Sequence, residues 1–229
     1  MKQILTTFAI GGLLCCSPAR AEDAKTPPKK LSPARVSVFQ APLQCPAAPQ
    51  IGCGSRAKPM LLELERDSSV SEAWLNRAGT KVAVVWKLES KLKARRSVAT
   101  KLKEQEATEI KGKPRDEAIT EFLSGNGWYR GADVDRLSEE EAGIIAVRLV
   151  QRVEAKTTLP KEKAEALQHA LADALKKRLT DDKTKLEQDA LLKLPDGLQQ
   201  VAGQYLDKDQ IPILKEAIAA GWRPLRNEK

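Results

Sequence analysis

The two cysteines Cys45 and Cys53 are the side chains with the clearest capacity for chemistry. They bracket a proline-containing segment that ends in Cys53-Gly-Ser-Arg56. Two thiols in an exported chain can close a structural disulfide, bind a soft metal ion such as Cu(I) or Hg(II), or act as a redox pair. The residue types leave these three uses open.

Cys53 has the better position for reactivity. Apolar residues at helical spacing and Pro59 in the first turn predict a short amphipathic helix over 55–66. Cys53 therefore precedes a helix amino terminus, where the macrodipole favours a thiolate. The cations Arg56 and Lys58 act in the same direction, so we expect Cys53 to have a lowered pKa.

The amino terminus has the pattern of an export signal. Lys2 is followed by the short apolar run Ile4 to Cys16, and Ala19-Arg20-Ala21 provides a cleavage site. Cleavage near Ala21 would release a periplasmic or secreted protein and remove Cys15 and Cys16. We expect residues 1–21 to be a signal peptide and residues 22–34, rich in Lys and Pro, to be a flexible linker.

Charge and hydropathy exclude some classes of protein. Of 39 basic and 31 acidic residues, cleavage removes only Lys2 and Arg20, which leaves 37 basic residues and a net charge of +6. Basic and acidic residues are interspersed, so no nucleic-acid partner is expected. After the signal no stretch reaches about 18 uncharged apolar residues, so no integral membrane segment is expected.

Residues 35–134 read as an α+β unit. A strand is expected near Val36–Phe39, followed by the helix 55–66 and a β-hairpin whose strands, 70–76 and 81–88, are joined at Gly79. A helix over 114–124 and a closing segment near 128–134 complete a ferredoxin-like βαββαβ order, with helices on one sheet face. We interpret the charged stretch 90–113 as an insertion that forms an exposed helical arm.

This order resembles the heavy-metal-associated domain of periplasmic mercury carriers and copper chaperones. The family places Cys-x-x-Cys at the start of its first helix; here Cys53 takes the first cysteine position, and Arg56 stands where the second cysteine would be. Further positions match the family's core and its second helix: Met60, Leu64, Val70, Ala73, Leu75, Val82, Val84, Ile119, Phe122, Leu123, Gly127 and Trp128. The resemblance implies a soft-metal site, in which Cys45 would replace the missing ligand.

Residues 135–229 are expected to form a helical bundle. Ser138-Glu-Glu-Glu141 has the form of a capping box, and apolar residues follow it at helical spacing. Pro160 opens a second helix. Shorter helices are expected over 183–192, 195–205 and 208–220.

The sequence lacks the usual catalytic patterns. The only histidine, His169, lies off the apolar stripe of its helix, and the chain has no phosphate-binding loop, dinucleotide fingerprint or His-Glu-x-x-His motif. We read the acidic run Glu139 to Glu141 as favouring a helix start. We therefore expect a protein that is not an enzyme.

Two functions are favoured for this non-enzymatic chain, and a thiol redox protein that uses the same cysteine pair is a third alternative. The first is an exported metal-handling accessory protein with Cys53 and Cys45 as ligands and Cu(I) or another soft ion as cargo. The second is a periplasmic interaction module in which Cys45 and Cys53 form a structural disulfide. In either, a protein partner could contact Arg56 and Trp74, because Trp74 faces away from Ala73 and Leu75 on its strand.

Overall fold

The computed structural model describes residues 31–181, 194–226 and 228. The predicted signal peptide, most of the linker and the helix expected over 183–192 lie outside the described residues. Within them no helix is both long and apolar enough to cross a membrane.

The fold is mixed α and β, with an antiparallel sheet as its centre. The strands are β1 (Val36–Gln40), β2 (Val70–Asn76), β3 (Lys81–Trp86), β4 (Thr108–Glu109) and β5 (Trp128–Arg130), and their order in the sheet is β4-β1-β3-β2-β5. The predicted hairpin is confirmed: Ala73 pairs with Val84, and Gly79 in the turn has φ of 69°. Only glycine adopts this backbone conformation at little cost.

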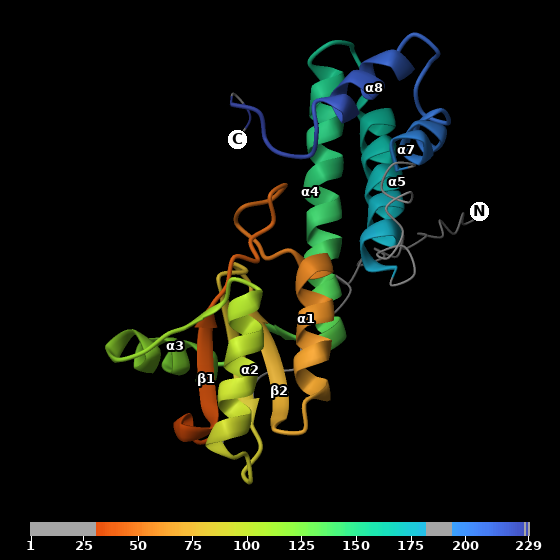
Figure 1. The fold of residues 1–229 in the computed structure, drawn as a ribbon. Helices are drawn as coiled ribbons and strands as arrows, with labels where there is room; N and C mark the ends of the chain where they lie inside the picture. Colours follow the sequence, from red (N-terminus) through yellow and green to blue (C-terminus); the bar gives the residue numbers. More distant parts are fainter. Residues whose placement is uncertain (1–30, 182–193, 227, 229) are drawn as a thin grey trace, which may run out of the picture.

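Helices cover both faces of the sheet. On one face lie α1 (Gly54–Arg66) and α2 (Leu92–Glu104), and on the other lies α3 (Lys113–Leu123) (Figure 1). The expectation that helices occupy one face only is therefore wrong. Helices cover both faces because β1 and β3 carry apolar side chains on each side of the sheet. Val38 and Val85 face α3, and Phe39 and Val84 face α1 and α2.

The charged stretch 90–113 is not an exposed arm. It forms α2 and then β4, which pairs with β1 through Phe39↔Glu109 and Gln40↔Thr108. Val98 and Leu102 of α2 are buried against the sheet layer. The segment is thus part of the core, with its basic residues on the outer side.

The carboxy-terminal part is helical. A short 3-10 helix, η2 (Gly131–Val134), leads into the long α4 (Asp135–Glu154), which pairs with α5 (Lys161–Thr180). Two short helices, α7 (Leu194–Ala202) and α8 (Ile211–Ala219), pack on this pair (Figure 1). The helix expected from Ser138 begins earlier, at Asp135, so Ser138 is a buried residue inside α4 and not its cap.

The first turns of α4 lie beside α1 (Figure 1). One continuous apolar core runs from the α1 and α2 face of the sheet into the space between α4, α5, α7 and α8. The sheet layer and the helical part therefore meet at α1 and α4, and this contact forms the surroundings of the cysteines.

Candidate functional site

The two cysteines are brought together by a short antiparallel ladder. Gln44 and Gly52 form an isolated bridge, flanked by hydrogen bonds from the Cys53 N–H to the Leu43 carbonyl (2.7 Å) and from the Cys45 N–H to the Ile51 carbonyl (2.8 Å). Side chains on either side of such a bridge point to the same face. Cys45 and Cys53 are therefore diagonal neighbours on one side of the ladder.

The hairpin turn between β2 and β3 holds this ladder in place. The Gly79 carbonyl accepts a hydrogen bond from the Leu43 N–H (2.9 Å), and the Gly52 N–H donates to the Arg77 carbonyl (2.6 Å). A Cβ at Gly79 would lie 2.4 Å from the Leu43 carbonyl oxygen, so the two loops can approach this closely only with glycine at that position. The fold thus fixes the cysteine ladder at one end of the sheet.

Both thiols are free and almost wholly buried, with 1% of Cys45 and 5% of Cys53 exposed. Cys53 is the residue before the first turn of α1, as the sequence predicts. The two thiols lie close enough for each to shift the acidity of the other. The Cys53 sulfur also lies 3.3 Å from the Ser55 hydroxyl.

The two thiols have opposite acidities. The neighbouring Cys45 thiol, followed by the Ser55 hydroxyl and the positive charge of Arg56, lowers the pKa of Cys53 to about 6 despite its burial. The neighbouring Cys53 sulfur, burial and the negative charge of Glu141 raise the pKa of Cys45 far above its ordinary value. At neutral pH the pair therefore holds one thiolate, on Cys53, and one proton, on Cys45.

Glu141 is a site residue that the sequence interpretation missed. It lies on α4, is 7% exposed, and is close enough to Cys45 to raise the pKa of that thiol. Burial and the charge of Cys53 raise its pKa to about 7, and its Oε2 has no hydrogen-bond partner. Its position was detectable, because Glu141 stands four and eight residues before the buried Ile145 and Leu149 and so shares their helix face.

Two further residues of α4 hold the cysteine segment. Arg148 donates hydrogen bonds to the carbonyl oxygens of Ala47 (2.9 Å) and Trp222 (2.5 Å), and burial lowers the pKa of its guanidinium. Ser138 packs on the start of α1, where a Cβ added to Gly54 would lie 2.6 Å from its Oγ. The Ser138 hydroxyl is fully buried and has no hydrogen-bond partner.

The two residues expected to contact a partner have different positions. Arg56 is exposed on the first turn of α1. Trp74 is only 2% exposed, because α3 covers it and Phe122 packs edge-on against its indole with ring centroids 6.0 Å apart. Trp74 is therefore not at the surface of the folded chain, while His169 lies exposed on α5 as expected.

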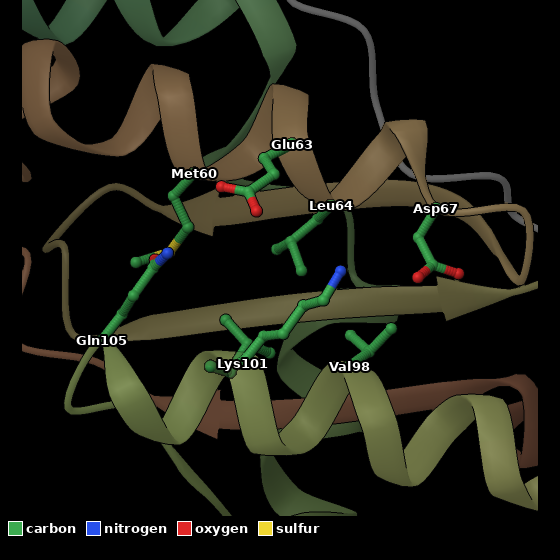
Figure 2. A pocket seen from close by; sticks show the side chains of 8 residues that line it. Met60, Glu63, Leu64, Asp67, Val98, Lys101 and Gln105 are labelled. Carbon is green, nitrogen blue, oxygen red and sulfur yellow. The ribbon is translucent and has the colours of Figure 1, made fainter.

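The cavity between α1 and α2 is too small to be a ligand site. Met60 and Leu64 of α1 face Val98 of α2, with Lys101 and Gln105 at the rim (Figure 2). Its volume of about 20 Å³ is close to what one water molecule needs.

The comparisons with known proteins leave the family open. No family model, curated protein or solved structure matches the chain.

The donor set at the thiol pair limits which ions it suits. In the described residues no group of three or more His, Cys, Asp or Glu side chains is arranged to hold a metal ion. Two adjacent sulfurs suit a soft ion of low coordination number, because thiolates favour soft ions such as Cu(I). The same two sulfurs could also close a disulfide.

Proposed function

We propose that this chain is an exported accessory protein that carries a soft metal ion, Cu(I) or Hg(II), between the sulfurs of Cys45 and Cys53. The observation that supports it best is the ladder at Gln44 and Gly52, which places Cys45 beside Cys53 at the amino terminus of α1. One sulfur is already a thiolate at neutral pH. The ion would displace the shared proton from Cys45 and bind both sulfurs.

The strand order supports a relationship to the heavy-metal-associated domain. The β4-β1-β3-β2 part of the sheet, with α1 after β1 and α2 after β3, has the order of a ferredoxin-like βαββαβ unit. In this assignment α2 and β4 take the places that we had expected for 114–124 and 128–134, and α3 and β5 are additions. Cys53 then occupies the place of a family ligand, and Cys45 supplies the second sulfur.

The acidity of Cys53 also favours a metal-binding role. A thiolate is the form of cysteine that binds metals, and its stabilisation by Cys45 and Ser55 makes Cys53 available at neutral pH. A permanent structural disulfide would need no such stabilisation. Arg56, exposed beside the site, balances the negative charge that two thiolates and one monovalent ion would create.

A second function is favoured by burial. Because only 1% of Cys45 and 5% of Cys53 is exposed, a disulfide at this point would place no charge in the core. The chain would then be an exported interaction module whose Cys45–Cys53 disulfide fixes the ladder beside α4. Forming it would remove two electrons and the one remaining proton from the thiol–thiolate pair, and the oxidant of the export compartment would accept the electrons.

Thiol counting and copper competition separate the two functions. Fully reduced mature protein is titrated anaerobically with Cu(I) in the presence of a chromogenic Cu(I) chelator. We expect one Cu(I) per chain, lost in Cys45→Ser and in Cys53→Ser. Met60→Leu is the matched control, because it removes the remaining sulfur of the mature chain and leaves the thiols intact.

The interaction module predicts a different result. The isolated protein would contain no free thiol before reduction, and the reduced protein would take no Cu(I) from the chelator. That pair of results would rule out metal carriage.

A further inference from the structure

The corner between β3 and α2 carries an exposed apolar pair among basic residues. Leu88 is 80% exposed and Leu92 is 64% exposed. The corner, defined as residues 87–96, holds five basic residues against one acidic residue, Glu89. The basic residues are Lys87, Lys91, Lys93, Arg95 and Arg96.

Hydrogen bonds hold the corner in a fixed shape. The Lys87 N–H and the Ser90 hydroxyl both donate to the Ser69 carbonyl, at 3.0 Å and 2.9 Å, and the Ser90 N–H donates to the Lys87 carbonyl at 3.1 Å. These hydrogen bonds fix the backbone of the corner against Ser69, the residue before β2. Leu88 and Leu92 are therefore held away from the core and cannot fold back onto it.

The cations of the corner are available to a partner. Arg95 is used internally, since it donates to the Ala34 carbonyl at 3.3 Å and lies 5.4 Å from the centre of the Trp86 ring. Over the described ranges 31–181 and 194–226, by contrast, Lys91, Lys93 and Arg96 form no ion pair. The amino terminus of α2 adds a positive end of a helix dipole at Leu92.

The corner is far from the cysteines. β3 runs from the Gly79 turn, which holds the cysteine ladder, to Trp86 at the opposite end of the sheet. The loop before α2 is the lower extremity of the molecule in Figure 1, and α4, α5, α7 and α8 lie at the other end. A surface could therefore meet the corner without covering the thiols.

A lipid surface suits this corner better than a folded protein does. A stable protein interface buries about 800 Å² on each partner and usually centres on aromatic anchors. The corner offers two leucines and no exposed aromatic ring. Insertion of a few apolar side chains beside several cations is instead how proteins bind anionic bilayer surfaces.

We propose that residues 87–96 dock this protein on an anionic phospholipid bilayer. Leu88 and Leu92 enter the interface, while Lys91, Lys93 and Arg96 contact lipid phosphates. This surface is independent of the function proposed for Cys45 and Cys53. It leaves the thiol site at the end of the molecule that faces away from the bilayer.

Vesicle co-sedimentation with the full mature chain tests the proposal. We expect binding to vesicles that contain phosphatidylglycerol, little binding to pure phosphatidylcholine, and loss of binding as salt rises and the screening length falls from about 10 Å at 0.1 M to about 3 Å at 1 M. Lys91→Glu with Lys93→Glu should weaken binding by about tenfold or more. Leu88→Ser with Leu92→Ser should weaken it by about fivefold or more.

Matched controls test whether the corner itself is responsible. Leu225→Ser removes another exposed leucine, and Lys177→Glu reverses an exposed charge on α5; both should bind vesicles like the wild type. Circular dichroism checks that each variant is folded. The proposal would be overturned if the corner variants bound vesicles as well as the control variants do. It would also be overturned if the protein bound soluble poly-glutamate but not the anionic vesicles, a result that would indicate an acidic polypeptide partner.

Discussion

Cys45 and Cys53 are diagonal neighbours on one side of the ladder at Gln44 and Gly52, and their proximity makes the two thiols unequal in acidity. Cys53 is the more acidic because the Cys45 thiol, the Ser55 hydroxyl and Arg56 stabilise its thiolate, and Cys45 is the less acidic because it is buried beside Cys53 and Glu141. The pair therefore holds one proton and one negative charge at neutral pH. A soft cation displaces that proton and binds both sulfurs, whereas an oxidant removes two electrons as the proton leaves and the disulfide forms.

The thiolate of Cys53 should be visible by titration. The ultraviolet absorbance of reduced protein should rise with a midpoint at about pH 6 and correspond to one thiolate per chain. Cys45→Ala removes the hydrogen-bond donor, so the midpoint should move upward, whereas Cys45→Ser keeps a donor and should move it less. A wild-type midpoint near the ordinary cysteine value of about 8.5 would contradict the assignment.

Glu141 should make the reduced protein less stable as the pH rises. Its pKa is about 7 in the folded chain against an ordinary value of 4.5, so the folded state holds the proton more tightly, and stability is lost between those two pH values. Glu141→Gln cannot ionise. It should therefore be more stable than the wild type by roughly 1–3 kcal/mol at pH 8 and nearly equal to it at pH 4.

Urea unfolding of the reduced proteins at both pH values measures this difference. Glu154→Gln, at an exposed position of the same helix, is the control and should change little at either pH. If Glu141→Gln had the same effect at pH 4 and pH 8, the buried carboxyl would not be the cause.

The contact between α1 and α4 should depend on Gly54. A Cβ there would lie 2.3 Å from the Val134 carbonyl oxygen and 2.6 Å from the Ser138 Oγ, and the backbone oxygen cannot move freely. Gly54→Ala should destabilise the protein by about 1–3 kcal/mol. Because Cys53 precedes this glycine, the substitution should also alter the thiolate midpoint.

Gly143 provides the matched comparison within α4. A Cβ there meets no atom within 4 Å. Gly143→Ala should raise stability by about 0.5–1 kcal/mol, because alanine favours the helix. Denaturant unfolding of both variants checks the pair, and equal effects would refute the close packing assigned to Gly54.

Local patterns in the sequence predicted the elements that local interactions determine. The helix after Cys53 and the hairpin at Gly79 were found because spacing and turn chemistry act within a few residues. The start of α4 was misplaced at Ser138 because η2 leads into the helix from Asp135 and supplies its first turn. The two-residue strand β4 has no pattern of its own and forms only because the edge of β1 is available to pair with it.

Of the candidate site residues, the sequence indicated Cys45 and Cys53 but not Glu141. Cys53 could be placed at a helix start from sequence spacing. The approach of Cys45 depends on the ladder at Gln44 and Gly52, and the approach of Glu141 depends on α4 packing beside α1. Both are long-range contacts, which local sequence patterns do not reveal. For this reason the run Glu139 to Glu141 was interpreted as a helix start, although Glu141 is buried beside the Cys45 thiol.

X-ray absorption at the copper edge tests the central claim most directly. Reduced protein loaded with one equivalent of Cu(I) should show two sulfur neighbours and no oxygen or nitrogen ligand, and Cys45→Ser should lose one sulfur. A copper site with oxygen or nitrogen ligands, or a spectrum unchanged in Cys45→Ser, would contradict the proposal that Cys45 and Cys53 together hold the ion.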